Sequence, residues 1–217
     1  MPASELSLFQ RRCQNSFFGL MASLRKGLSA WPSQNMRTVR RLCRLEGHSD
    51  GVVGSILASK EPEAGLALIA ARGRLMQALP ENGEMLAVMG TVAQIEPILQ
   101  KENGSRDRAA RVEIAAFNGP RNVVVAGARE GVRAVARQLE SQGLRSRALT
   151  VSHAFHSPLM EPMLAEFAAT ARTVTYAAPQ LPVVSNITGE LAAADIATPD
   201  YWVRQVRQPV LVEAKAP

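Results

Sequence analysis

The chain has 217 residues, of which 47% are hydrophobic and 20% are charged, an ordinary globular composition that excludes a wholly disordered or fibrous protein. The net charge of +6 is concentrated in residues 1–50, which carry eight of the 25 Lys and Arg residues and only three acidic ones. Because the basic residues are confined to this terminal stretch and it matches no nucleic-acid module, we expect no nucleic-acid partner.

Membrane and secreted classes are also disfavoured. Apolar stretches such as residues 64–71 are far shorter than the ~20 residues of a membrane-spanning helix. Residues 1–30 mix basic and polar residues into every apolar run, unlike a signal peptide. Cys13 and Cys43 are too few for a disulfide framework or a cysteine metal site. We therefore expect a cytoplasmic protein with no membrane partner.

The first predicted element is a helix over residues 63–79. Residues 1–46 show neither a 3.6-residue nor a 2-residue apolar period, so no element is predicted there. From residue 63, leucine, isoleucine and methionine recur at helical spacing up to Leu79, and Pro80 ends the run. One face of this helix is predicted to be buried.

Residues 84–151 alternate between strand and helix patterns. Thr91 can cap a helix over 91–100, and Gly143 can close a second helix that carries Val132 and Leu139 on one face. Asn-Gly within Asn118-Gly119-Pro120 supplies the positive φ values of a tight hairpin turn. Strands are predicted at 85–89, 112–117, 122–126 and 145–151. The order β-α-β-β-α-β is that of the ferredoxin-like unit.

Two helices are predicted beyond this unit. The first covers residues 158–173, which carry an apolar stripe, and the second covers residues 200–208 after Thr198-Pro199. A short apolar run at 182–185 and a turn at Thr188-Gly189 lie between them.

Ser49 is a candidate nucleophile. The segment GHSDG at 47–51 matches G-x-S-x-G, in which glycines flank a serine on a sharp turn between a strand and a helix. The following helix N-terminus helps to stabilise an oxyanion. The same five residues can also form a polar surface loop, because the residues before them make a poor buried strand.

His153 and His156 are candidates for a general base. They lie between a predicted strand and a predicted helix, where side chains commonly point into a cleft. A neutral imidazole is well matched to deprotonating a serine near pH 7. A structural histidine is the alternative, and a metal pair is disfavoured because no third ligand is evident.

Arg72 projects from the apolar stripe of the 63–79 helix. It lies four residues after Leu68 and three before Leu75. An arginine in this position either extends its charged end to the edge of the stripe or binds an anion. Guanidinium geometry suits a bidentate contact with a carboxylate.

Four segments of the chain, taken together, resemble one known family. They are AARGRLMQ at 70–77, AAFNGPR at 115–121, VSHAFHSPLM at 151–160 and VSNITG at 184–189. The resemblance is to the acyltransferase domain of modular type I polyketide synthases, within the malonyl-CoA:acyl carrier protein transacylase family. It runs from about residue 63 to residue 210, and four motifs in the family's order make it specific.

The resemblance implies an α/β fold in which a ferredoxin-like small subdomain is inserted into an α/β-hydrolase-like large subdomain. In this chain the small subdomain corresponds to residues 83–151. An incomplete large subdomain corresponds to residues 47–82 and 152–217, and residues 1–46 form a divergent basic segment.

The family's reaction is a ping-pong acyl transfer from coenzyme A to the thiol of an acyl carrier protein. Carried over by position, Ser49 is the nucleophile, His156 is its general base and Arg72 holds the free carboxylate of malonyl. A backbone carbonyl in the segment matching residues 202–205 usually orients the base, which makes Gln205 a further catalytic candidate.

The resemblance also bears on substrate and partners. The His-Ala-Phe-His form at 153–156 is similar to the malonyl-selecting version, so His153 and Phe155 are expected to contact substrate. Phe155 is expected to narrow the pocket against a branching methyl group. The implied partners are malonyl-CoA, an acyl carrier protein and other polyketide synthase domains. Coenzyme A enters as a thioester substrate, and no metal or bound cofactor is implied.

The chain departs from the family at three points. Residues 1–46 lack the glutamine that contributes to the family's oxyanion hole, Val52 replaces a glutamate, and the family's C-terminal portion is missing after Val212. A truncated, non-catalytic acyltransferase remnant is therefore one alternative. A serine esterase is another, and Arg72 disfavours it because a simple esterase needs no carboxylate clamp.

Overall fold

The computed structural model describes residues 62–104, 106–178 and 184–212. Segment 1–46, both cysteines and Ser49 lie outside these residues. The described elements are α4 (Pro62–Gln77), β1 (Gly83–Met89), α5 (Val92–Asn103), η1 (Arg108–Ala110), β2 (Val112–Gly119), β3 (Asn122–Ala128), α6 (Arg129–Ser141), β4 (Arg145–Ala148), η2 (Pro158–Met163), α7 (Leu164–Arg172), η3 (Ala194–Ala197), α8 (Pro199–Arg207) and β5 (Val210–Leu211).

One mixed sheet, in the order β4-β1-β3-β2-β5, forms the centre of the described part. Strand β1 pairs antiparallel with β3 and β4, and β2 pairs antiparallel with β3. The short strand β5 joins the far edge, parallel to β2, with Ala116 opposite Val210. The first four strands with α5 and α6 are the predicted β-α-β-β-α-β unit, so the α/β fold with a ferredoxin-like unit is confirmed.

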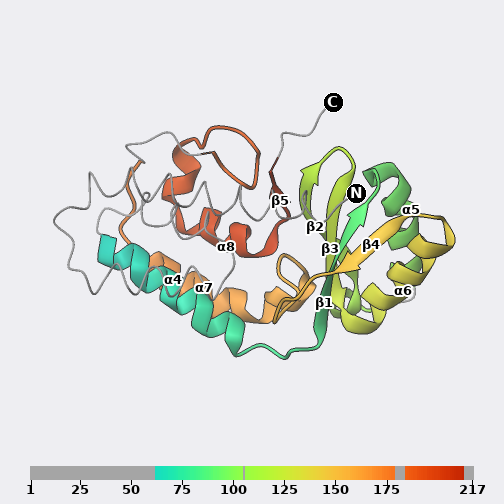
Figure 1. Cartoon of the computed structure of the whole chain (residues 1–217). Coiled ribbons are helices and arrows are strands. Elements are labelled where there is room, and N and C mark those ends of the chain that lie inside the picture. Colours follow the sequence, from blue (N-terminus) through green and yellow to red (C-terminus); the bar gives the residue numbers. More distant parts are fainter. Residues whose placement is uncertain (1–61, 105, 179–183, 213–217) are drawn as a thin grey trace.

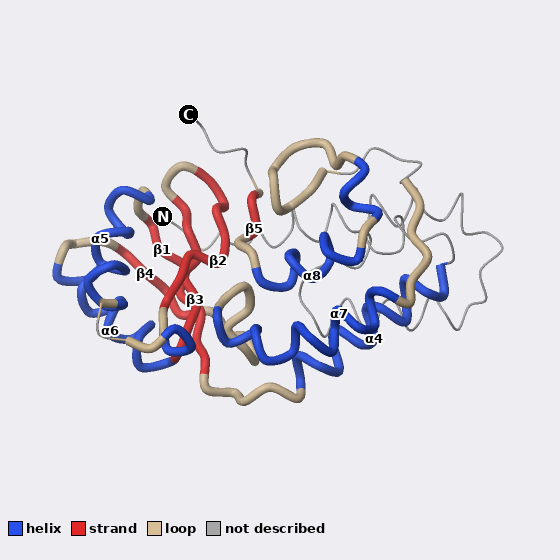
Figure 2. The backbone as a smooth tube through the Cα atoms, turned by 180° about the vertical axis from the view of Figure 1, so that it is seen from behind, coloured by secondary structure: helices blue, strands red, loops and turns tan. Residues whose placement is uncertain are grey.

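The sheet separates two apolar cores because successive side chains of a strand point to opposite faces. Leu86 and Val88 of β1 pack with buried residues of α5 and α6. Met85, on the other face, belongs to a core with Leu68 of α4 and Phe167 of α7. Figures 1 and 2 show this arrangement, with α5 and α6 together at one end and α4, α7 and α8 at the other. Each fully buried Leu, Val or Phe stabilises the fold by about 1.5–3 kcal/mol.

Helix α6 ends as the sequence predicts. Gly143 has a φ of +73°. Its N–H donates to the Glu140 carbonyl at 2.9 Å, and the Leu144 N–H donates to the Leu139 carbonyl at 2.9 Å. These two bonds are those of the Schellman motif, which a glycine at this position permits without steric cost. The turn directs the chain into β4.

The turn of the β2–β3 hairpin differs from its prediction. Gly119 still pairs with Asn122, so Pro120 and Arg121 form the turn instead of Asn118-Gly119. Among the described residues only His156 is a non-glycine with positive φ, and Asn118 lies within strand β2. Proline's fixed φ favours the first corner of a turn, which explains the shift by two residues.

Two predicted elements are shorter or tighter than expected. The strand predicted over 145–151 ends at Ala148. The helix predicted over 158–173 begins as the 3-10 segment η2 and becomes α-helical only at Leu164. Pro162 lies inside η2 and has no N–H to donate, which breaks the α-helical hydrogen-bond ladder there. The predicted turn at Thr188-Gly189 is present, with Gly189 at a φ of +75°.

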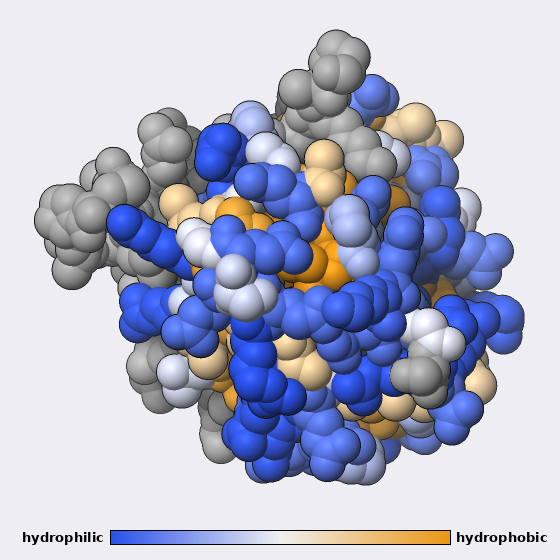
Figure 3. Space-filling view, turned by 90° about the vertical axis from the view of Figure 1, so that its right-hand side faces the viewer, coloured by the Kyte–Doolittle hydropathy of each residue, from blue (hydrophilic) through white to orange (hydrophobic). Residues whose placement is uncertain are grey.

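The surface of the sheet end is mainly hydrophilic, with smaller hydrophobic patches between polar side chains (Figure 3). None of the helices in the described ranges combines the length and apolar character needed to cross a bilayer. Whether the subdomain boundaries fall at residues 83 and 151 stays a prediction.

Candidate active site

His156 lies in the turn between β4 and η2, and its backbone is unusual. Its φ is +57°, and only 2% of the residue is exposed. Nδ1 lies 2.8 Å from the backbone carbonyl oxygen of Gln208. Because a carbonyl oxygen can only accept, Nδ1 carries the proton. A neutral imidazole of this tautomer has its basic lone pair on Nε2, which is the state a general base needs.

The residues around His156 fix this turn. The Ser157 hydroxyl donates to the Ala154 carbonyl at 2.6 Å and accepts from the Leu159 N–H at 3.3 Å. His153 is also buried, and its Nε2 lies 3.0 Å from the carbonyl oxygen of Leu79, just beyond α4. These contacts hold the turn to the helix that precedes the sheet.

Phe155 lies in the same buried turn. It is 8% exposed, and its ring centroid is 6.3 Å from that of His153. The two rings therefore lie close to each other in the turn that contains His156. Their predicted contact with substrate stays a proposal.

Arg72 is buried on α4, and one of its partners lies on α8. Its Nη1 donates to Oε1 of Gln205, and the two residues are 3% and 1% exposed. Arginine has only donors, so the amide oxygen of Gln205 must face it. This contact joins residues 133 positions apart in the chain.

The last turn of α8 brings the arginine and the histidine together. Gln205 contacts Arg72, and three residues later Gln208 contacts His156. Gln208 directly follows Arg207, the last helical residue, so both contacts lie at the C-terminal end of α8. The guanidinium and the imidazole are thus both fixed to the C-terminal end of α8.

The position of the orienting carbonyl corrects a sequence-based expectation. It was expected within residues 202–205, but the carbonyl bonded to His156 belongs to Gln208. A local signal existed, because Gln208 precedes Pro209 and such residues favour extended backbone. Gln208 is extended, with φ −75° and ψ 154°, and it ends the helix. Gln205 instead contributes its side chain, which faces Arg72.

An ion-pair network anchors the same end of α8. Arg207 Nη2 lies 2.8 Å from Glu113 Oε2 on β2, and its Nε lies 3.1 Å from Glu161 Oε1 on η2. Burial, the largest single influence, raises the pKa of the Glu161 carboxyl. Hydrogen bonds and charge attraction from Arg108 and Arg207 together outweigh it, so this pKa lies below the ordinary 4.5. The network connects α8 to the sheet and to the segment that follows His156.

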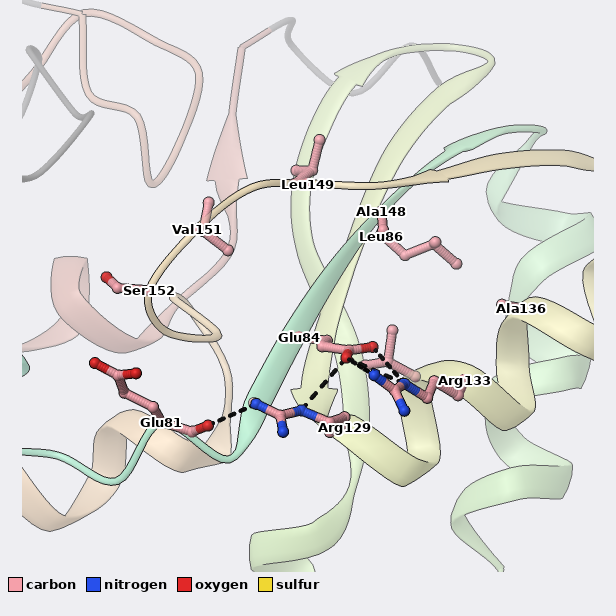
Figure 4. Close-up of a pocket in the computed structure, with 12 residues that line it drawn as sticks. Glu81, Glu84, Leu86, Arg129, Arg133, Ala136, Ala148, Leu149, Val151 and Ser152 are labelled. Atoms are coloured by element: carbon pink, nitrogen blue, oxygen red, sulfur yellow. Dashed lines mark hydrogen bonds and ion pairs between the residues drawn. The ribbon is translucent and has the colours of Figure 1, made fainter.

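A separate cavity lies between β1, α6 and the segment after β4 (Figure 4). Its volume is about 480 Å³, and three of its charged side chains pair with one another. Glu84 pairs with Arg129 at 3.4 Å and with Arg133 at 2.7 Å, and Arg129 also donates to the Glu81 carbonyl at 2.8 Å. The cavity contains none of the predicted site residues. In the part of the chain that the structure describes, no group of three His, Cys, Asp or Glu side chains is placed to bind a metal.

The structure thus brings together three of the predicted residues, Arg72, His156 and Gln205, with His153 and Phe155 in the adjoining turn. Gln208 is the residue that the sequence interpretation missed. The arrangement offers a base and a guanidinium at one buried location, which suits chemistry on an acyl group that carries a negative charge.

Comparisons with known proteins point to one family. A family model described as "Acyl transferase domain" matches residues 43–216. The chain is 50% identical over 143 residues, or 66% of its length, to a Mycobacterium tuberculosis phenolphthiocerol synthesis polyketide synthase type I whose name includes the word inactive. It spans 8% of that synthase and 4% of another mycobacterial synthase that it matches.

Solved structures agree. The acyltransferase domain from the second module of the salinomycin polyketide synthase superposes with a TM-score of 0.68 at 41% identity, covering 75% of this chain and 37% of that one. A malonyl CoA-acyl carrier protein transacylase from Clostridium perfringens gives a TM-score of 0.63 at 26% identity, covering 70% of this chain and 48% of that one.

Proposed function

Because this chain belongs to the acyl transferase domain family of polyketide synthases, we propose that it transfers a malonyl unit from coenzyme A to an acyl carrier protein through a serine ester. The observation that carries the proposal is the pair of contacts at the C-terminal end of α8, where Gln205 contacts Arg72 and Gln208 contacts His156. The similarity to a solved malonyl CoA-acyl carrier protein transacylase supports the choice of substrate.

In the proposed first half-reaction, the Ser49 hydroxyl attacks the thioester carbonyl while His156 Nε2 takes its proton. The carbon–sulfur bond then breaks, and the coenzyme A sulfur leaves with the proton from the imidazolium. The second half-reaction reverses these roles. The carrier-protein thiol gives its proton to His156 and attacks the serine ester, and the Ser49 oxygen regains a proton as it leaves. The Gln208 carbonyl stabilises the imidazolium through Nδ1–H in both steps.

Arg72 is proposed to bind the free carboxylate of malonyl. A buried guanidinium forms charge-assisted bonds with a carboxylate, and these are stronger than neutral ones. An acetyl group has no carboxylate, so Arg72 is proposed to favour malonyl-CoA over acetyl-CoA as the substrate. His153 and Phe155 are proposed to form the wall near the methylene carbon of malonyl, where Phe155 opposes a branching methyl group.

The test measures the transfer of malonyl and of acetyl from coenzyme A to a carrier protein by two variants, Arg72→Leu and Arg74→Leu. Arg74 lies on the same helix, but its side chain is 63% exposed and pairs with Glu166. Losing a hydrogen bond to a charged group costs about 1.5–3 kcal/mol. We therefore expect Arg72→Leu to lower kcat/KM for malonyl-CoA by about 10- to 100-fold, with little change for acetyl-CoA. Equal effects of the two variants would contradict the proposal.

A non-catalytic acyltransferase remnant is the second candidate, and the word inactive in the name of a 50% identical relative favours it. Its signature is a folded chain that forms no acyl-enzyme with malonyl-CoA. The other polyketide synthase domains proposed as partners follow from the same relatives, in which the matching segment is a small part of a long synthase.

A further inference from the structure

We propose that the side-chain amide of Gln205 is a second carboxylate-binding group beside Arg72. This inference rests on the proposed function, and it gives the Gln205 side chain a role distinct from that of the Gln208 carbonyl, which contacts His156. Oε1 of Gln205 accepts from Arg72 Nη1. Nε2 is buried and makes no hydrogen bond within the described residues. The residue as a whole is 1% exposed.

A buried amide with one end satisfied and the other unsatisfied needs an explanation. An amide nitrogen has two N–H donors, and leaving both without acceptors in a buried position destabilises the folded protein. The orientation of the amide is not free to change, because Arg72 requires an acceptor and only Oε1 is one. The donors of Nε2 are therefore held available by the contact that positions Arg72.

The chemistry of the donors selects the ligand. Oε1 and Nε2 share one carbon atom, so Nε2 lies next to the guanidinium edge that Oε1 contacts. Both groups present N–H donors, and one of them is positively charged. The group that accepts from both is an anion with two acceptor oxygens, and a carboxylate has this form.

The place of Gln205 in the fold also fits a malonyl carboxylate. Gln205 lies one turn before Gln208, whose carbonyl holds His156. In malonyl thioesters a single methylene carbon separates the carboxylate from the reacting carbonyl. A carboxylate at Arg72 and Gln205 would therefore leave the thioester at the end of α8 where His156 is held.

The test measures binding of malonyl-CoA and acetyl-CoA to the full chain by calorimetry, for the wild type, Gln205→Met and Gln205→Glu. Methionine keeps the length but has no amide, so it removes both contacts. Glutamate still accepts from Arg72 but has no donor and repels a carboxylate. We expect the wild type to prefer malonyl-CoA, and each variant to reduce that preference by about 10- to 100-fold. Gln142→Met, an exposed substitution at the end of α6, should leave the preference unchanged.

Several results would overturn the inference. One is a wild type with no preference for malonyl-CoA, and another is a Gln205→Glu variant that keeps the preference. If Gln205→Met does not fold, Gln205→Glu decides, because it retains an acceptor for Arg72. A structural role alone would weaken binding of both thioesters equally, which also contradicts the proposal.

Acyl-enzyme formation, followed in the same samples, separates this inference from the proposed function. A preference for malonyl-CoA that depends on Gln205, without any acyl-enzyme, would refute the proposed reaction and leave the inference standing. Acyl-enzyme that forms from malonyl-CoA with equal selectivity in all variants would refute the inference alone.

Discussion

Replacing His156 by alanine or by glycine separates its backbone strain from its chemistry. At a φ of +57° the backbone of an L-residue is strained by about 1–2 kcal/mol, because Cβ approaches the following carbonyl oxygen. Both variants lose the imidazole and its 2.8 Å bond to Gln208, so these losses cancel when the two are compared. Glycine avoids the strain but loses about 0.5–1 kcal/mol more conformational entropy on folding. We expect His156→Gly to be more stable than His156→Ala by about 0.5–1 kcal/mol.

Equilibrium urea unfolding, followed by circular dichroism, measures this difference through the midpoint and slope of the transition. Gly143→Ala is the matched control, because Gly143 has a φ of +73° and nothing lies within 4 Å of an added Cβ. Its backbone cost should appear as a destabilisation of about 0.5–1 kcal/mol. If Gly143→Ala shows that cost while His156→Ala is as stable as His156→Gly, the left-handed conformation of His156 is refuted.

Three further predictions concern packing, pH and selectivity. Gly127→Ala should destabilise the protein by about 3 kcal/mol in thermal or urea unfolding, because the added Cβ would lie 2.3 Å from the Arg111 carbonyl oxygen. The control is Gly104→Ala, whose added Cβ would have its nearest contact at 3.5 Å. This control should change the free energy of unfolding by less than about 0.5 kcal/mol. The lowered pKa of Glu161 means that its contribution to stability is present above the unfolded-state pKa and is lost as pH falls through the folded-state pKa. Glu161→Gln should therefore flatten the fall of melting temperature below about pH 5, and an unchanged slope would contradict the ion-pair network. Phe155→Ser should raise the ratio of methylmalonyl to malonyl transfer by about tenfold or more, and an unchanged ratio would remove Phe155 from the selectivity wall.

The ferredoxin-like unit could be predicted because its information is local. Strand alternation, helix periodicity and the closing Gly143 each act within a few residues, and they agree with one another. The two-residue strand β5 was missed for the opposite reason. It carries too little pattern of its own and forms only because β2 offers an edge nearly a hundred residues earlier in the chain.

The sequence names candidate residues for the site, but not the contacts among them. The burial of Arg72 follows from its place on an apolar stripe. Its contact with Gln205 joins two helices that no local pattern relates, and the carbonyl facing His156 depends on where α8 stops. The positive φ of His156 could not be predicted from the sequence either, because a positive φ is uncommon for residues other than glycine and the surrounding turn imposes it. The role of Ser49 stays a prediction, since that residue lies outside the described part of the chain.

The most direct test of the proposed acyl transfer is intact-protein mass spectrometry after brief incubation with malonyl-CoA, on the wild type, Ser49→Ala and His156→Ala. The proposal predicts that the wild type gains the mass of one malonyl group, that Ser49→Ala gains none, and that His156→Ala gains it far more slowly. A folded wild-type chain that gains no malonyl group, or a gain that persists in Ser49→Ala, would contradict it.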